Sequence, residues 1–96
     1  MQQEAIPLAL GGGDLIACAA TGTGKTLAFV LPIVERLQGK AGVGALILAP
    51  TRELAIQISR HAQRFCGARG LAVAVLTGGV ARHEQVPELA GANLLV

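Results

Sequence analysis

Short apolar runs alternate with longer amphipathic segments along this chain, and this pattern predicts an α/β fold. The apolar runs are continuous rather than interrupted by polar residues, and glycine or proline lies close to each of them. Strands that are buried on both faces of a parallel sheet have this composition. We therefore predict a parallel sheet covered by helices on both faces, with the edge of its last strand unpaired. The predicted strands span residues 14–18, 45–49, 71–76 and 93–96.

The helical spacing of apolar residues predicts the connections between these strands. A helix is expected over 25–37, with a kink or local break at Pro32 because proline removes a backbone donor. A second helix is expected over 52–66. A short polar helix is expected to follow Gly79 and to end near Gly91. The second helix is predicted to carry one apolar face, made by Leu54, Ile58, Ala62 and Phe65.

A glycine-interrupted loop over residues 19–26 lies between the first predicted strand and the first predicted helix. Its glycines allow the backbone to turn sharply and to direct N–H groups at phosphate oxygens. Lys25 can reach the β- and γ-phosphates, and the Thr26 hydroxyl can ligate Mg²⁺, while the helix dipole favours the same anions. Position 19 is alanine, where such a loop usually begins with glycine. The predicted nucleoside-triphosphate site consists of Thr21, Gly22, Thr23, Gly24, Lys25 and Thr26.

Two further polar turns follow predicted strands. Pro50–Arg52 comes after the second strand, and Thr77–Gly79 comes after the third. The carboxyl ends of parallel strands meet at one edge of a sheet, so we expect both turns and the phosphate loop to share that edge. Thr51 suits the N-cap of the helix that follows it, and a helix N-terminus beside an arginine suits a nucleic-acid phosphate.

Composition and charge exclude several classes of protein. Hydrophobic residues make up 52%, charged residues 15%, and the net charge is +2, which excludes a disordered chain and does not by itself indicate nucleic acid. The longest apolar run is interrupted by Pro32 and too short to span a membrane, and no secretory signal is apparent.

Cys18 and Cys66 lack metal-binding or redox spacing, and we expect buried free thiols in a cytoplasmic protein. His61 and His83 are isolated and indicate neither metal binding nor acid–base chemistry.

Four motifs in order give the chain a resemblance to the DEAD-box RNA helicases. Residues 2–7, Gln-Gln-Glu-Ala-Ile-Pro, resemble the end of the family's Q motif, and residues 19–26 match its motif I, including the alanine at the first position. Residues 50–55, Pro-Thr-Arg-Glu-Leu-Ala, match motif Ia at every position. Gly78–Gly79 lies where the family has a double-glycine turn. Motif Ia is the specific element, because a phosphate loop alone is shared with many ATPases.

The resemblance implies an ATP-dependent RNA helicase with a RecA-like (P-loop NTPase) parallel sheet flanked by helices. Gln2 would read the adenine edge, Lys25 and the phosphate loop would hold ATP, and Thr26 would ligate Mg²⁺. In the family, ATP and RNA close two RecA-like domains on a bent strand, and hydrolysis releases the strand. The RNA backbone would be held, without sequence readout, by Pro50, Thr51, Arg52, Gly78 and Gly79.

Several parts of the family pattern do not occur in these 96 residues. Asp-Glu-Ala-Asp is absent, as are the Ser-Ala-Thr motif and the second RecA-like domain with its arginine finger. We therefore expect residues 1–96 to be the N-terminal half of the ATP-binding domain, truncated at its C-terminus in an incomplete gene model or a truncated gene. The parent protein is expected to hydrolyse ATP, whereas these residues alone are expected to be inactive, marginally stable and prone to aggregate.

Two other functions stay open on the sequence. A related superfamily 2 DNA helicase or translocase shares motif I and a version of motif Ia, although Gln2 and the complete motif Ia argue against it. A non-catalytic nucleotide- or RNA-binding remnant, or an inert product, would keep the motifs without turnover. Gln2 also fits a solvated terminus, Thr51 a plain helix cap, and Gly78–Gly79 a plain turn. The arginines expected to be solvated surface residues are Arg60, Arg64, Arg69 and Arg82.

Overall fold

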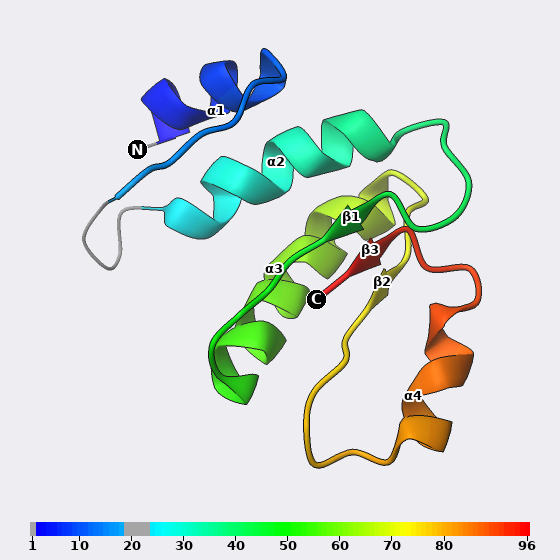
Figure 1. Cartoon of the computed structure of the whole chain (residues 1–96). Helices are drawn as coiled ribbons and strands as arrows, with labels where there is room; N and C mark the ends of the chain where they lie inside the picture. The colour runs from blue at the N-terminus through cyan, green and yellow to red at the C-terminus, as the bar shows by residue number, and fades with distance from the viewer. Residues whose placement is uncertain (1, 19–23) are drawn as a thin grey trace.

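The protein is described by a computed structural model that covers residues 2–18 and 24–96. Helices and short strands alternate along the chain, as the apolar pattern predicts (Figure 1). The elements are α1 (Gln2–Leu10), α2 (Lys25–Leu37), β1 (Ala45–Leu46), α3 (Arg52–Ala68), β2 (Val73–Ala74), α4 (Arg82–Leu89) and β3 (Leu94–Leu95).

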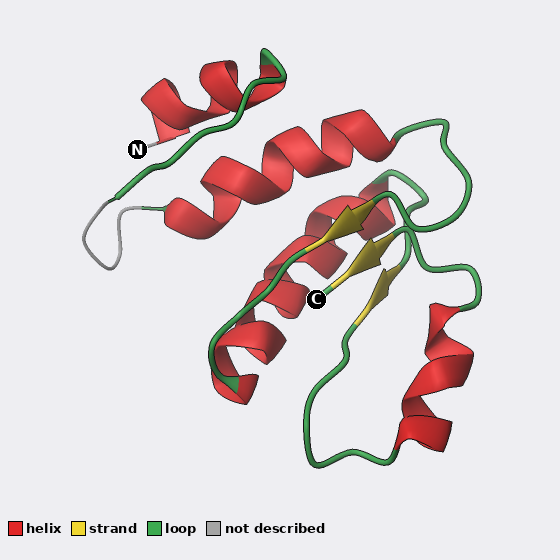
Figure 2. Ribbon diagram, in the orientation of Figure 1, coloured by secondary structure: helices red, strands yellow, loops and turns green. Residues whose placement is uncertain are grey.

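The three strands form one parallel sheet in the order β1-β3-β2 (Figure 2). Leu94 of β3 lies opposite Ala45 of β1 on one side and Val73 of β2 on the other. The last strand is therefore central, and the prediction that its edge is unpaired was wrong. Strand order depends on where each crossover connection returns to the sheet, and local sequence does not encode it. The side chain of Leu94 is fully buried, as expected for a central strand.

Helices α2 and α3 cover one face of the sheet and form the core with it. One buried cluster joins the helices to the sheet region, and its members include Val30 and Val34 of α2, Ile58 of α3, and Ile47 and Leu94. Hydrophobic burial of this kind is the main stabilising contribution in such a small domain.

The described residues leave the opposite face of the sheet uncovered along β1, so the prediction of coverage on both faces was wrong. Leu46 is 62% exposed and Leu48 84% exposed, whereas Ile47 between them is buried. Alternate residues of an extended segment point to opposite faces, and a second face is buried only when another layer packs on it. No residue of α4 is buried, and it therefore supplies no such layer.

Residues 14–18 do not form the predicted strand. They lie in an extended connection that has no strand ladder with the described part of the chain. Ile16 is 94% exposed, and Cys18 is an exposed free thiol rather than the predicted buried one. An apolar run becomes a strand only when neighbouring strands take up its backbone hydrogen bonds. Cys66 is buried as predicted.

The helices match the predicted periodicity with three differences. Helix α2 runs without a break through Pro32, whose side chain is buried, because packing against α1 and α3 holds the helix on both sides. Helix α1 had no counterpart among the predicted elements. In α3, Ile58 and Ala62 are buried as predicted, whereas Leu54 and Phe65 are 37% and 36% exposed and lie beside the buried stripe. The other buried residues of α3 are Ala55, Ser59 and Cys66.

No helix in the described part of the chain is long and apolar enough to cross a membrane.

Candidate nucleotide and nucleic-acid site

The carboxyl edge of the sheet gathers the polar turns. Figure 1 shows that α2 and α3 both begin at the edge towards which the strands run, and that the chain after β2 turns beyond the same edge. Residues 19–23, which include the predicted site residues Thr21, Gly22 and Thr23, lie outside the described residues. The described part of the phosphate loop motif is Gly24, Lys25 and Thr26.

The start of α2 has the geometry of an anion site. Gly24 is the N-cap, with a left-handed backbone (φ 81°), and it offers no side chain to the first-turn N–H groups. Its carbonyl accepts the first helical hydrogen bond, from Ala28 N–H at 3.3 Å. The side chain of Lys25 is exposed, and Thr26 is half-buried. Free N–H groups, the helix dipole and a lysine side chain at one helix start suit a phosphate group.

Gln2 lies against this helix start. A Cβ atom at Gly24 would overlap Nε2 of the Gln2 amide, so glycine leaves the room that the Gln2 side chain occupies. The structure thus brings the first helix of the chain, through Gln2, to the last glycine of the phosphate loop. Contact with adenine, which the resemblance implies for Gln2, stays a prediction.

The turn before α3 is built as predicted. Thr51 has an extended backbone (φ −133°, ψ 157°), and its Oγ1 accepts a hydrogen bond from Leu54 N–H at 3.1 Å. Its carbonyl accepts from Ala55 N–H at 3.0 Å. Glu53 lies in the first turn, where a negative charge complements the helix dipole. The N-cap role of Thr51 is confirmed.

The guanidinium of Arg52 lies over the double-glycine turn. A Cβ atom at Gly79 would be 2.6 Å from Arg52 Nη1, and one at Gly78 would be 3.7 Å from Nη2. Gly79 also has a φ of +86°, which side chains rarely adopt. The backbone therefore favours glycine at position 79, and a side chain there would displace the end of Arg52 from the turn.

These two turns share one cleft, although they are far apart in the sequence. It has a volume of about 210 Å³ and lies between the end of β1, the start of α3 and the turn after β2. The described residues place no acidic side chain within ion-pair distance of Arg52, because their one ion pair joins Arg69 to Glu35. The cleft therefore presents an unneutralised positive charge beside a helix N-terminus, which suits a phosphate oxygen. Its lining residues are Ala49, Pro50, Thr51, Arg52, Ala55, Leu76, Thr77 and Gly78.

Gln85 of α4 holds one of these two turns, and the sequence analysis did not identify it. Its Oε1 accepts a hydrogen bond from Thr77 N–H at 2.8 Å, and its Nε2 donates to the carbonyls of Thr77 and Val80 at 3.0 and 2.7 Å. A polar residue at one position of a short polar helix gives no signal of such contacts.

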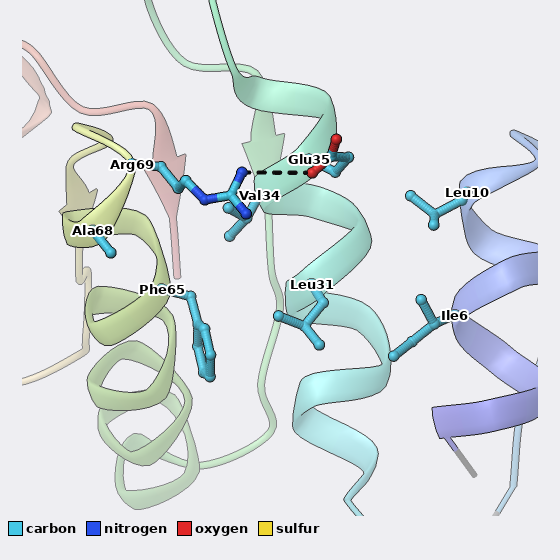
Figure 3. Close-up of a pocket in the computed structure, with 8 residues that line it drawn as sticks. All are labelled: Ile6, Leu10, Leu31, Val34, Glu35, Phe65, Ala68 and Arg69. Atoms are coloured by element: carbon cyan, nitrogen blue, oxygen red, sulfur yellow. Dashed lines mark ion pairs between the residues drawn. The ribbon is translucent and has the colours of Figure 1, made fainter.

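A second cavity lies between α1, α2 and α3, away from these turns (Figure 3). Leu31 of α2 and Phe65 of α3 line it, with Ile6 and Leu10 of α1 on the opposite side. Its volume is about 290 Å³. An exposed ion pair of 3.7 Å between Arg69 and Glu35 crosses its mouth, and an exposed pair of this kind contributes little to stability. This cavity carries none of the predicted site residues.

Solved structures with this fold define its class. The chain is 40% identical to a DEAD box protein from the hyperthermophile Methanococcus jannaschii, with a TM-score of 0.89 over 96% of this chain and 26% of that one. It is 42% identical to the RNA-helicase Prp28 from Chaetomium thermophilum, a structure bound to ADP, with a TM-score of 0.85 over 99% of this chain and 25% of that one. The parallel sheet with its flanking helices thus has a RecA-like fold.

A family model and a curated relative identify the family of this chain. The family model for the DEAD/DEAH box helicases matches residues 1–96. The chain is 44% identical to DEAD-box ATP-dependent RNA helicase 52A of Oryza sativa subsp. japonica, over the whole of this chain and 19% of that relative. This chain belongs to the DEAD/DEAH box helicase family, and it spans about a fifth of the length of that relative.

Proposed function

We propose that the protein carrying this chain is an ATP-dependent RNA helicase, and that residues 1–96 form the N-terminal half of its ATP-binding RecA-like domain. The observation that supports this most strongly is the placement of the Arg52 guanidinium over Gly78 and Gly79, beside the capped start of α3. Family membership and the ADP-bound relative Prp28 support the nucleotide part of the proposal. The name of the rice relative supports the RNA part.

The start of α2 fits a nucleotide phosphate, because Gly24 leaves the helical N–H groups without a side-chain cap. In the proposed function the loop residues Thr21–Gly24 enclose the phosphates with backbone N–H groups, and Lys25 adds a positive charge at the β- and γ-phosphates. Thr26 ligates Mg²⁺, which neutralises phosphate charge when it is bound. Gln2, already packed on Gly24, contacts the adenine end of the nucleotide.

The cleft between the two turns binds the sugar-phosphate backbone. Its donors are a guanidinium, a threonine hydroxyl and the backbone N–H groups of a glycine turn, all of which match phosphate oxygens and none of which reads a base edge. Pro50, Thr51, Arg52, Gly78 and Gly79 therefore hold RNA without sequence preference. Binding of single-stranded RNA here, coupled to ATP hydrolysis in the complete protein, separates short duplexes.

A cytoplasmic location is part of the proposal. It rests on the two cysteines, which are both free thiols in the structure. Free thiols are typical of reducing compartments.

The test compares the two lysines of the chain in the protein expressed from its native reading frame. Lys25→Ala is expected to lower RNA-stimulated ATP hydrolysis on the order of a hundredfold, because it removes transition-state charge stabilisation at the phosphates. Lys40→Ala removes an exposed lysine in the loop after α2 and should leave the rate unchanged. Equal rates for wild type and Lys25→Ala would contradict the proposal.

The same preparation separates the other functions that the sequence leaves open. Stimulation by single-stranded DNA in preference to RNA would assign the chain to a DNA helicase or translocase. Tight ATP binding without any turnover would assign it to a non-catalytic binding protein.

A further inference from the structure

One amide side chain of α4 is hydrogen-bonded to the double-glycine turn at both of its ends. Gln85 accepts a hydrogen bond from Thr77 N–H at 2.8 Å on the side where β2 ends. It donates to the carbonyl of Thr77 at 3.0 Å and to the carbonyl of Val80 at 2.7 Å on the far side of the glycines. In the described part of the chain, no other side chain is hydrogen-bonded to the backbone of Thr77 or Val80.

The turn has little else to hold its shape. The last ladder bond before it joins Leu76 N–H to the Val96 carbonyl at 2.8 Å. Two glycines follow Thr77, and glycine loses more conformational entropy on ordering than any other residue. No residue of α4 is buried, so packing does not anchor that helix against the turn. The Gln85 hydrogen bonds therefore fix the turn and the start of α4 together.

We propose that Gln85 is a positioning residue for nucleic-acid binding. It holds the Thr77–Gly79 backbone in the conformation over which the Arg52 guanidinium lies, so that the turn and the arginine line one cleft. Gln85 is not among the residues that line that cleft and acts through the turn. This inference rests on the proposed function of the cleft.

The experiment measures the affinity for a fluorescent single-stranded oligouridylate, over a range of salt concentrations, in the protein expressed from its native reading frame. Gln85→Met keeps the side-chain length and removes all three hydrogen bonds. We expect it to weaken RNA binding on the order of tenfold, because the turn is no longer held in the conformation over which Arg52 lies, although Arg52 itself is kept. Gln63→Met, on the exposed side of α3, is the matched control and should bind RNA as wild type does.

The salt dependence of RNA affinity distinguishes a loss of positioning by Gln85 from a loss of phosphate contacts. Gln85 neutralises no phosphate, so Gln85→Met should leave both the salt slope and the ATP affinity unchanged. Arg52→Ala should weaken binding and lower the slope by about one, as expected for one lost phosphate contact. An Arg52→Ala variant with wild-type affinity and slope would contradict the proposed function itself. If Arg52→Ala weakens binding, then wild-type binding by Gln85→Met, or a lowered slope in that variant, would overturn the inference about Gln85.

Amide hydrogen exchange tests the same contact first in the wild-type protein and then in the variant. In the wild-type protein the Thr77 amide should be protected, because the Gln85 side chain is its acceptor. In Gln85→Met that protection should disappear, while the Leu76 amide, bonded to Val96, stays protected. Exchange of the wild-type Thr77 amide at the rate of a free peptide would overturn the inference.

Discussion

The two candidate sites at the carboxyl edge of the sheet differ in how firmly the described residues hold them in place. Hydrogen bonds hold both turns of the cleft beside α3: Thr51 Oγ1 accepts from Leu54 N–H, and the Gln85 side chain accepts from and donates to the glycine turn. In the segment that leads into the phosphate loop, by contrast, Leu15 is 41% exposed and Ile16 is 94% exposed. Similar apolar sequence thus gives a buried sheet in one place and an exposed connection in another.

The difference shows what an apolar run requires to become part of a core. Residues 45–49 and 93–96 have partners on the sheet and contribute buried side chains such as Ile47 and Leu94. Residues 14–18 have a comparable composition and no ladder partner in the described chain. Composition makes burial favourable, but the geometry of neighbouring strands decides whether it occurs.

Thiol reactivity gives the largest expected contrast between the two regions. Cys18 is exposed in the connection before the phosphate loop, whereas Cys66 is buried in α3. Burial also raises the pKa of the Cys66 thiol above its ordinary value of 9.0, which lowers its thiolate fraction. We expect Cys66 to react at least about a hundredfold more slowly than Cys18 with a small thiol reagent, because it reacts only after local opening.

The measurement uses the variants Cys18→Ser and Cys66→Ser, each of which leaves one thiol. Equal labelling rates would contradict the difference in packing. The raised pKa of Cys66 also determines in which direction folding stability changes with pH. The unfolded chain deprotonates at the lower pH, so the contribution of Cys66 to folding stability is present below 9.0 and is lost as the pH rises through the raised folded-state value.

Gly79→Ala tests the cleft at its closest contact. The new methyl group would lie 2.6 Å from Arg52 Nη1 and would also force alanine into a φ of +86°, so the arginine must move off the turn. We expect RNA affinity to fall about tenfold, the magnitude of one lost charge-assisted contact, with ATP affinity unchanged. Gly39→Ala is the matched control, because Gly39 has a similar φ of +75° with no atom near its Cβ position. An equal loss of RNA affinity in both variants would show that backbone strain alone, not the position of Arg52, matters.

Thr51→Ala tests the cap that orients the start of α3. It removes the acceptor of the Leu54 N–H hydrogen bond and should lower the free energy of unfolding by about 1 kcal/mol. Thr51→Ser keeps the hydroxyl and should retain most of the stability. Urea unfolding monitored by circular dichroism measures both variants, and indistinguishable midpoints for wild type and Thr51→Ala would contradict the capping role.

Ile16→Ser should have the smallest effect. Its side chain is almost wholly in solvent, so the free energy of unfolding is expected to change by less than about 0.5 kcal/mol. Ile47→Ser places the same hydroxyl in the buried cluster and should cost several times more, about 3 kcal/mol, through lost apolar burial and an unsatisfied polar group. A large destabilisation by Ile16→Ser would contradict the exposure of Ile16 and support the buried strand that the apolar run predicts.

The sequence alone was sufficient for the elements and motifs that depend on near neighbours. The positions of α2 and α3, the Thr51 cap and the order of the helicase motifs could all be predicted, because helical periodicity, capping and turn chemistry act within a few residues. The resemblance in motif Ia pointed to the family to which the chain belongs. Sequence reasoning also indicated that the turns after the strands share one edge, since parallel strands leave no other arrangement.

Only the tertiary structure decided which distant segments meet. It placed β3 between β1 and β2, left one face of β1 exposed, and removed residues 14–18 from the sheet. It also brought Gln85 into hydrogen bonds with the turn after β2, and Asn93 into one with the carbonyl of Gly42, a residue 51 positions away. These features depend on residues that are far apart in the sequence and meet only when the whole chain folds. A local pattern of polar and apolar residues therefore does not encode them.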